Sequence, residues 1–528
     1  MNKQSKPALL WAALCGVLAV GFGLLAAELV AGFLSPSLSA VTAVGGTVID
    51  VVPPGVKDWA IASFGTSDKF FFLIGMALVI AILAALAGIL ELKRKSWGLV
   101  AVGIFGLLGL LAVLARSAGS LAGNGVLVLV SPLLAAALSI VLLRVLINRL
   151  RGWRAVAGSL QNLDEASRTQ PAGQERRLFL RNIGLSAAAT ALTALVTAAI
   201  RGSQAAYQAA REKLKLPMAQ QAAAPISANA QLALNGITSL VTPNKQFYRI
   251  DTALAVPVIN PNDWQLKVTG LVDREISMNL AELLNQPMQE RYVTIACVSN
   301  EVGGDLIGNA RWLGWPVREI LAKAGVKPGA DMVLSRSSDG FTASTPLQAM
   351  TDQRDAMIAV GMNGELLPAE HGFPARLIVP GLYGFVSATK WLTELKVTTF
   401  AADVAYWSTR GWSDHGPIKQ SSRIDLPRSG SAVPAGPTVL GGMAWAQQRG
   451  VSKVELSVDG GDWQPVKLAS AISKDTWVQW QAELMLDRGE HQVRVRCVDG
   501  LGEVQSSEVA PPAPDGSSGY HQITLRVG

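Results

Sequence analysis

The sequence predicts a multi-domain protein with an N-terminal α-helical transmembrane bundle, a central α+β domain and a C-terminal β-sandwich. Hydrophobic residues make up 50% of the 528 residues and charged residues only 16%, whereas charged residues make up about 25% of a typical soluble domain. The apolar excess lies before residue 201, and strand patterns lie after residue 246. We expect a transmembrane region at 1–201, a linker at 202–245, the central domain at 246–428 and the sandwich at 429–528.

Five apolar stretches in the first 201 residues are long enough to cross a membrane. A bilayer core of about 30 Å takes ~20 residues of helix. The fifth stretch, rich in Ala, Thr and Leu, is the least hydrophobic of the set. The stretches lie at about 8–32, 70–91, 98–115, 125–147 and 182–200.

The positive charge of the chain belongs to its apolar half. Residues 1–201 carry 17 Lys and Arg against 8 Asp and Glu, while residues 202–528 carry 29 against 31. This distribution indicates membrane topology rather than a surface for phosphates, so we expect no nucleic-acid partner. Basic residues at the N-terminus, at 93–95 and throughout 144–181 mark cytoplasmic segments. Five crossings then place everything after about residue 202 outside the cytoplasm, in a multi-pass protein of the cell membrane.

A pair of arginines precedes the fifth apolar stretch. Arg176 and Arg177 lie in the segment Glu-Arg-Arg-Leu-Phe-Leu-Arg at 175–181, which is similar to a twin-arginine export signal. Such a signal suits a domain that receives a cofactor in the cytoplasm before it crosses the membrane. The alternative is that both arginines are ordinary cytoplasmic anchors.

The region from 246 to 400 alternates strand and helix patterns. Runs at 264–268 and 376–379 are typical of strands, and the patterns near 279–285 and 316–324 favour helices. The preceding segment, rich in Ala, Gln and Pro, is typical of a linker.

From about residue 430 the pattern changes to short strands. The runs at 454–458 and 492–496 alternate apolar and polar residues, and each is followed by an Asp-Gly turn. This spacing predicts a β-sandwich of immunoglobulin type.

The three cysteines are far apart and form no paired motif, so each is interpreted singly. Cys15 lies in an apolar helix and Cys497 in a strand-like run, where a buried, inert thiol is expected. Cys297 ends the β-branched run 292–296 and precedes polar turn residues. Taken alone, such a cysteine is more often packing than a ligand.

Three further blocks resolve the interpretation of Cys297. They are Gly-Asn-Ala-Arg-Trp-Leu-Gly at 308–314, the segment from His371 to Gly384, and Ser-Ala-Thr-Lys-Trp at 387–391. In this order and separation they resemble the sulfite-oxidase family of molybdopterin enzymes, over roughly 246–528. The resemblance implies a central molybdopterin domain, a molybdenum–molybdopterin cofactor, and a C-terminal domain like the one through which relatives dimerise.

The resemblance also implies roles for individual residues. Cys297 occupies the place of the thiolate that binds molybdenum, which suits a soft ligand. Arg249 occupies the place of an Arg-Asn-His entry to the cofactor pocket, but Ile250 and Asp251 follow it here. Asp339 is either a cofactor contact or a surface turn. The remaining expected cofactor-binding residues are His371 and Arg376 for the pterin, and Ser387, Ala388, Thr389 and Lys390 for the phosphate.

The activity implied by the resemblance is oxygen-atom transfer on a small molecule outside the cytoplasm. Sulfite-oxidising relatives carry a basic residue shortly after the cysteine, whereas Glu301 stands there in this chain, so sulfite is not the expected substrate. The sequence shows no haem or iron–sulfur motif, which predicts a separate electron carrier; a homodimer is also expected. Trp407, Trp412, His415 and Lys419 form either a substrate mouth or packing between domains.

Two other functions remain open at this point. A membrane-tethered binding module on the same fold would hold no metal. A cell-surface adhesion protein would use the sandwich alone, and would leave the blocks around Cys297 and Lys390 without a role.

Overall fold

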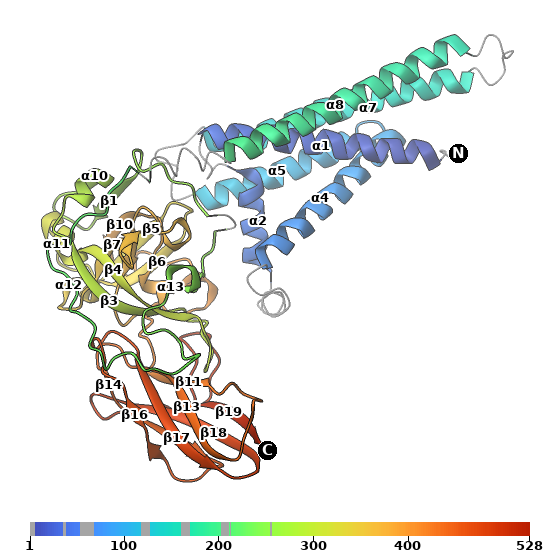
Figure 1. Ribbon diagram of the computed structural model, residues 1–528. Helices are drawn as coiled ribbons and strands as arrows, with labels where there is room; N and C mark the ends of the chain where they lie inside the picture. Colours follow the sequence, from blue (N-terminus) through green and yellow to red (C-terminus); the bar gives the residue numbers. More distant parts are fainter. Residues whose placement is uncertain are drawn as a thin grey trace. The chain divides into compact units, whose positions relative to one another are not determined.

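The computed structural model describes residues 6–34, 39–52, 68–117, 127–159, 169–201, 211, 213–253 and 256–528. The chain divides into two compact units, Met1–Ala206 with Thr252–Ala255 and Tyr207–Asp251 with Val256–Gly528. In the described residues the first unit is helical, whereas the second is built from sheets and short helices (Figure 1).

The described part of the first unit holds five helices that are long and apolar enough to cross a membrane, as the sequence predicts. A sixth helix, α2, has only 12 residues and was not expected. Helix α1 packs against α4, α7 and α8. The helices are α1 (Lys6–Leu34), α2 (Ala40–Val51), α4 (Asp68–Lys93), α5 (Trp97–Ser117), α7 (Leu127–Ser159) and α8 (Thr169–Arg201).

Glycines allow two of these helices to approach each other closely. A Cβ atom on Gly16 of α1 would overlap the carbonyl oxygen of Ala84 in α4, and one on Gly88 would overlap that of Ala12. Small residues at such crossings let backbones touch, which is how helices gain packing energy in lipid. Substitution of either glycine by a larger residue would push α1 and α4 apart.

A buried carboxylate joins α4 to α5 and α7. Glu91 accepts hydrogen bonds from the backbone N–H groups of Ser96, Gly98 and Leu99 at 3.0, 3.1 and 3.3 Å. Arg151 of α7 lies 3.5 Å from the same carboxylate. The Glu91 carboxylate thus satisfies free N–H groups at the start of α5, and these donors together with Arg151 offset the cost of burying Glu91.

The segment with the arginine pair lies inside α8. Arg176 and Arg177 are exposed, while Phe179 is fully buried. The ring of Phe179 lies 5.5 Å from the rings of both Trp11 and Trp153. The segment therefore has an exposed face with both arginines and a buried face where Phe179 packs in the helix bundle.

The central part of the second unit contains two five-stranded sheets. One has the strand order β2-β1-β10-β5-β6, with β1 and β10 parallel, and the other has the order β3-β4-β7-β8, with β9 paired to β7. Their strands are β1 (Gln265–Gly270), β2 (Ile276–Asn279), β3 (Gln289–Ala296), β4 (Ile307–Pro316), β5 (Met332–Ser337), β6 (Thr342–Pro346), β7 (Met357–Met362), β8 (Glu365–Leu366), β9 (Arg376–Ile378) and β10 (Leu392–Thr398).

Short helices connect these strands near the positions that the sequence predicts for two of them. Helix α10 begins with a reciprocal cap in which Asn279 and Glu282 bond each other's backbone N–H groups. In α11 the buried residues Val317, Ile320, Leu321 and Ala324 share one face, as the helical period requires. The helices are α10 (Leu280–Leu284), α11 (Val317–Ala324), α12 (Leu347–Thr351) and α13 (Gly384–Ser387), with 3-10 turns η5 (Asn244–Gln246), η6 (Ala369–His371) and η7 (Ser408–Arg410).

The C-terminal part is a β-sandwich of two sheets with the orders β11-β13-β17-β16 and β12-β19-β18-β14-β15. Alternate residues of β18, namely Val493, Val495 and Cys497, enter a core between the sheets. The immunoglobulin type stays a prediction. The strands are β11 (Ser421–Leu426), β12 (Ala432–Val433), β13 (Gly436–Trp445), β14 (Val451–Val458), β15 (Gln464–Pro465), β16 (Lys467–Leu468), β17 (Val478–Leu486), β18 (Gly489–Asp499) and β19 (His521–Val527).

Two segments near the expected domain boundaries pack in a way that composition did not reveal. Strand β11 lies before residue 428 but pairs with β13 of the sandwich. Residues 213–245, which are typical of a linker by composition, run along the second unit. There Ala230 and Leu240 are fully buried in its core, and Gln220 donates its N–H to the carbonyl of Met288 at 2.8 Å. The segment is therefore attached to the second unit at these points, and its role as a linker stays a prediction.

Candidate functional site

Cys297 immediately follows β3 and is buried, with 8% of its surface exposed. Its N–H donates to the carbonyl of Leu306 at 2.9 Å, which closes the loop that follows the strand. Burial raises the pKa of the Cys297 thiol, and hydrogen bonds from the backbone and side chain of Ser299 act in the opposite direction. A bound soft cation would reverse the effect of burial, because it stabilises the thiolate directly.

Arg376, in β9, is a buried cation with 4% of its surface exposed. Its Nη1 donates to the carbonyl of His371 at 3.1 Å and its Nη2 to that of Ala388 at 3.3 Å. Among the described residues its Nε has no hydrogen-bond partner, and no carboxylate pairs with the guanidinium. Burial lowers the pKa of Arg376 to about 10, which leaves the side chain charged at neutral pH.

Gly372 brings the backbone of His371 and Lys390 close to Arg376. It has a φ of +113°, and a Cβ atom there would lie 3.0 Å from the Cβ of Arg376 and 3.1 Å from that of Lys390. Both the backbone conformation and the space favour glycine. His371 itself is 3% exposed, and its Nε2 lies 2.9 Å from the carbonyl oxygen of Asn244. Burial lowers the pKa of His371 to about 4, so the ring is neutral at pH 7.

Lys390 shares one carboxylate with Arg249. Its Nζ lies 2.6 Å from Oδ2 of Asp251, and Nε of Arg249 lies 2.9 Å from the same oxygen. Burial lowers the pKa of Lys390 to about 8, and the charge of Asp251 limits that fall. Asp251 therefore neutralises part of the cationic cluster that includes Lys390 and Arg249.

The hydroxyl groups of Ser387 and Thr389 are bonded within the protein. Ser387 Oγ donates to the carbonyls of Leu382 and Tyr383 at 3.0 and 2.8 Å, and Thr389 Oγ1 lies 2.7 Å from Ser335 Oγ. Both hydroxyls fix the backbone of the 387–390 segment. Phosphate contacts from this segment would therefore come from the backbone and Lys390, and these assignments stay predictions.

Asp339 lies in the turn between β5 and β6, and its carboxylate accepts the N–H of Phe341 at 3.2 Å. The turn adjoins the cluster, since Ser338 donates its N–H to the carbonyl of Trp391 at 2.9 Å. The buried Oγ of Ser338 has no partner in the described structure. In this geometry the Asp339 carboxylate accepts a hydrogen bond from an N–H group of its own turn.

Two tyrosines near Cys297 were missed by the sequence analysis. Burial raises the pKa of Tyr248, which is also raised by the nearby sulfur of Cys297 and lowered by Arg376. Burial raises the pKa of Tyr383 to about 12, and Cys297 contributes again. Gly384, which follows Tyr383, lies close to both Tyr248 and the end of β3. A Cβ atom on Gly384 would lie 4.0 Å from the Tyr248 hydroxyl and 3.6 Å from the Ala296 carbonyl oxygen. The only sequence signal was their adjacency to Arg249 and to the glycine-bounded block at 381–384.

The expected aromatic and basic mouth is largely packed. The rings of Trp407 and Trp412 lie 6.0 Å apart and both pack against the main core. Lys419 donates to Asp515 at 2.9 Å and to the carbonyl of Gly516 at 2.6 Å. His415 stacks on Phe400 at 4.4 Å. This arrangement favours packing over substrate binding for the two tryptophans.

The cluster suits an anionic cofactor that brings its own metal ligands. Arg249 and Lys390 share the carboxylate of Asp251, and the charge of Arg376 acts on Lys390, so net positive charge remains for an anion. Within the described ranges no group of three or more His, Cys, Asp or Glu side chains could hold a metal ion. A metal bound by the Cys297 thiolate would therefore take its other ligands from the cofactor.

Comparison with known proteins gives one matching family model and several similar proteins. The family model for the oxidoreductase molybdopterin binding domain matches residues 253–407. Mitochondrial sulfite oxidase of Macaca fascicularis is 30% identical over 322 residues, which cover 51% of this chain and 58% of that protein. Sulfite oxidase of Gallus gallus is 29% identical over 321 residues, covering 51% and 69%. The sulfane dehydrogenase SoxCD structure from Paracoccus pantotrophus matches with a TM-score of 0.48 and 25% identity, covering 56% and 82%.

Proposed function

Because the chain belongs to the sulfite-oxidase family of molybdopterin oxidoreductases, we propose that it is a membrane-anchored enzyme that performs oxygen-atom transfer on a small molecule. The matching family model and the similar sulfite oxidases confirm the resemblance seen in the sequence motifs. The chain spans 58% of the length of the mitochondrial relative, so the activity of the whole protein is part of the proposal.

The observation that carries the proposal is the buried, unpaired guanidinium of Arg376. Burying a charge without an acidic partner is costly, and the cost is offset when an anion binds beside it. Lys390 and Arg249 add charge at the same place, and both Arg376 and Cys297 shift the pKa of Tyr248, which indicates that both lie near this residue. An anionic pterin with its phosphate fits such a cluster.

Each residue then has a defined task. Cys297 would bind molybdenum through its sulfur, and Arg376 and neutral His371 would hold the pterin. Lys390 and the backbone N–H of Thr389 would hold the phosphate beside Ala388, whose own N–H donates to the Gly384 carbonyl at 3.0 Å. Arg249 and Asp339 would lie at its margin. When bound, the cofactor supplies oxygen-atom exchange and a two-electron change at the metal. The protein contributes the ligand, the positive cradle and the exclusion of water around Cys297.

Metal and pterin analysis of the purified full-length protein tests this proposal. Wild type should contain molybdenum and pterin in near-equal amounts and give a Mo(V) electron paramagnetic resonance signal. Cys297→Ser should alter or abolish that signal, whereas Cys497→Ser, which changes another buried thiol, in the sandwich core, should leave it unchanged. A metal-free wild type would instead favour the binding-module alternative.

We propose that the substrate is not sulfite, although two of the similar proteins are sulfite oxidases. Glu301, four residues after Cys297, is exposed and acidic, and the ammonium group of Lys419 is already paired with Asp515. Neither arrangement favours an anion. A dye-linked assay should show little turnover with sulfite and more with an uncharged oxygen donor such as a sulfoxide; efficient sulfite oxidation would contradict this.

The proposed location is the cell membrane, with several spans and the catalytic domain outside the cytoplasm. The five apolar helices and the arginine-rich 144–181 segment support it. If Arg176 and Arg177 form an export signal, replacing both by Lys should keep the catalytic domain inaccessible to external protease. Replacing Arg149 and Arg154 of α7 by Lys in the same way should not.

Three finer points complete the proposal. Electrons would pass to a separate carrier, since no haem or iron–sulfur motif is found in the sequence. The protein would form a homodimer, and its C-terminal sandwich would be of immunoglobulin type, with domain limits at 246–428 and 429–528. Cross-linking and size-exclusion chromatography in detergent test the dimer.

A further inference from the structure

The strand that precedes Cys297 lies at the edge of its sheet. β3 pairs with β4 on one side only, so its outer backbone groups need other partners. Around Thr294 the sandwich supplies them. Thr294 donates its N–H to the Asp475 carbonyl at 3.0 Å, its Oγ1 accepts the N–H of Trp477 at 2.9 Å, and its carbonyl accepts a hydrogen bond from Gln447 Nε2.

The loop that follows Cys297 is held by the same domain. Ser517 Oγ donates to the carbonyl of Asn300 at 2.6 Å, and Arg423 Nη1 donates to that of Gly304 at 2.5 Å. Within the loop, the side chain of Asn300 accepts the N–H of Leu306 at 2.8 Å. Ser517 of the sandwich and Arg423 of β11, the strand that pairs with β13 of the sandwich, thus anchor a loop that is otherwise closed by its own hydrogen bonds.

A histidine of β19 fills the middle of this loop. Gly303 has a φ of +80°, and a Cβ atom there would overlap the ring of His521. The ring is itself oriented, because its Nδ1 accepts the N–H of Ile424 at 3.0 Å. The loop therefore rests on a fixed aromatic surface with no space between them.

From these contacts we propose that the C-terminal sandwich is a positioning device for Cys297, which fixes the sulfur by holding Thr294 before it and the loop Asn300–Gly304 after it. The inference rests on the proposed role of Cys297 as the metal ligand. Ser517, Arg423 and His521 are positioning residues, since they act on the sulfur through the loop. A sandwich that merely joined two domains would not control the reactivity of one thiol.

A serine pair tests the hydrogen bond to the loop. Ser517→Ala removes the donor to Asn300, while Ser518→Ala removes a neighbouring hydroxyl that bonds Glu508 within the sandwich. In the full-length protein from a host that cannot make the cofactor, alkylation of Cys297 is followed by mass spectrometry. Ser517→Ala should raise its rate about tenfold, and Ser518→Ala should not. Cys497, buried in the sandwich core, reports general unfolding, and its rate should stay constant.

A glycine pair tests the contact with His521. Gly303→Ala introduces a Cβ against the ring, whereas Gly502→Ala has a similar φ of +90° and open space around it. Gly303→Ala should speed alkylation of Cys297 and shift the Mo(V) signal of the loaded protein. The double variant with His521→Ala should restore both toward wild type, because the obstructing ring is gone.

Several results would overturn the positioning role. These are equal Cys297 rates in Ser517→Ala and Ser518→Ala, a Cys297 rate that rises only in step with Cys497, or no rescue in the double variant. Failure of the proposed function looks different, since wild type would then lack molybdenum. The alkylation rates do not depend on metal and would still decide whether the sandwich holds Cys297.

Discussion

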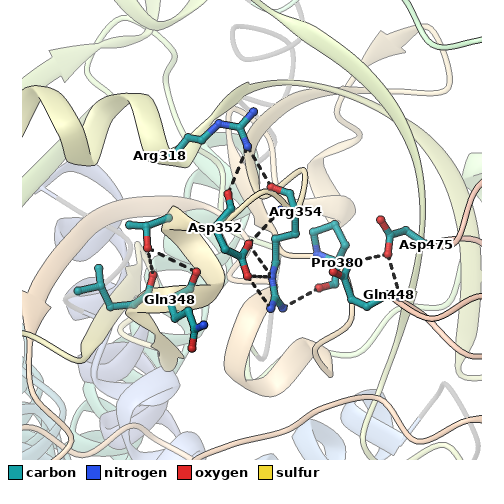
Figure 2. Close-up of polar contacts among 9 residues, drawn as sticks. Arg318, Gln348, Asp352, Arg354, Pro380, Gln448 and Asp475 are labelled. Carbon is teal, nitrogen blue, oxygen red and sulfur yellow. Dashed lines mark hydrogen bonds and ion pairs between the residues drawn. The ribbon is translucent and has the colours of Figure 1, made fainter. Parts of the chain in front are cut away.

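Arg354 and Arg376 lie in the same compact unit, but the protein compensates their positive charges in different ways. Arg354 lies in the network of Figure 2, where its Nε is 3.0 Å from both carboxylate oxygens of Asp352 and its Nη1 donates to the Pro380 carbonyl at 3.3 Å. Although burial raises the pKa of Asp352, Arg354 brings it below its ordinary value. Arg376 is more deeply buried, yet it bonds only two carbonyl groups and leaves its Nε without a partner in the described structure.

This difference supports our proposal that Arg354 has a structural role and that Arg376 binds a ligand. The charge of Arg354 is satisfied by the protein, so a further ligand would gain little from it. The charge of Arg376 is satisfied only in part, so an anion that binds there would offset the desolvation cost of the buried guanidinium. The same criterion identifies Lys390 as an intermediate case, because it shares Asp251 with Arg249.

The largest effect is expected where a carboxylate is removed from the cationic cluster. Asp251→Asn leaves Lys390 buried without its counterion, and we expect the cofactor-free protein to lose about 3 kcal/mol of unfolding free energy. Chemical unfolding of the full-length protein in detergent measures this loss. A loss as small as that of Asp352→Asn, whose carboxylate is a third exposed, would remove the distinction between the two sites.

A pH dependence from His371 extends the comparison to a neighbour of Arg376. Its folded pKa, about 4, lies below the ordinary 6.5, so the unfolded state binds a proton more readily between these values. Stability is therefore full above pH 6.5 and falls as the pH drops towards 4, by about 3 kcal/mol at pH 4. His371→Gln should flatten this part of the profile. An unchanged profile in the variant would assign the loss to other groups.

The two arginines should respond with opposite sign when each is replaced by an apolar side chain of similar length. In the cofactor-free protein, Arg376→Met removes a buried, unpaired charge and should raise the free energy of unfolding by about 2 kcal/mol. Arg354→Met breaks an ion pair and should lower it. Thermal unfolding of both variants side by side gives the signs, and equal signs would contradict the interpretation of Arg376.

The smallest effect is expected from a conservative change at the paired site. Arg354→Lys keeps the charge but loses the two-oxygen contact with Asp352. We expect a loss of about 1 kcal/mol or less, because the pair is partly exposed. Chemical unfolding resolves such a change, and a loss of several kcal/mol would show that the network carries more of the fold than its exposure indicates.

Much of this arrangement could be predicted from the sequence, for definable reasons. Apolar length alone identified the five candidate spans, and period-two patterns located β1, β14 and β18. The resemblance to the sulfite-oxidase family implied that His371, Arg376 and Lys390 hold one cofactor, and the structure brings these three residues close together. Helix α2, by contrast, has 12 residues of mixed Gly, Thr and Val, a composition without a clear helical signal.

The rest depends on contacts between distant segments, which no local pattern encodes. The pairing of β11 with β13 and the burial of Ala230 and Leu240 arise from tertiary packing. Tyr248 and Tyr383 are 135 residues apart in the numbering and meet only through the fold around Gly384. The hydrogen bonds from the sandwich to the Cys297 loop likewise join residues about 120 to 220 positions apart.

Cofactor content is the most direct test of the central claim that Arg376 holds an anionic cofactor beside Cys297. Full-length wild type, Arg376→Gln and Arg354→Gln are purified from a host that makes the cofactor, and their molybdenum and pterin are measured per protein. The account predicts that Arg376→Gln loses most of both while Arg354→Gln retains them. Equal, wild-type content in the two variants would contradict it.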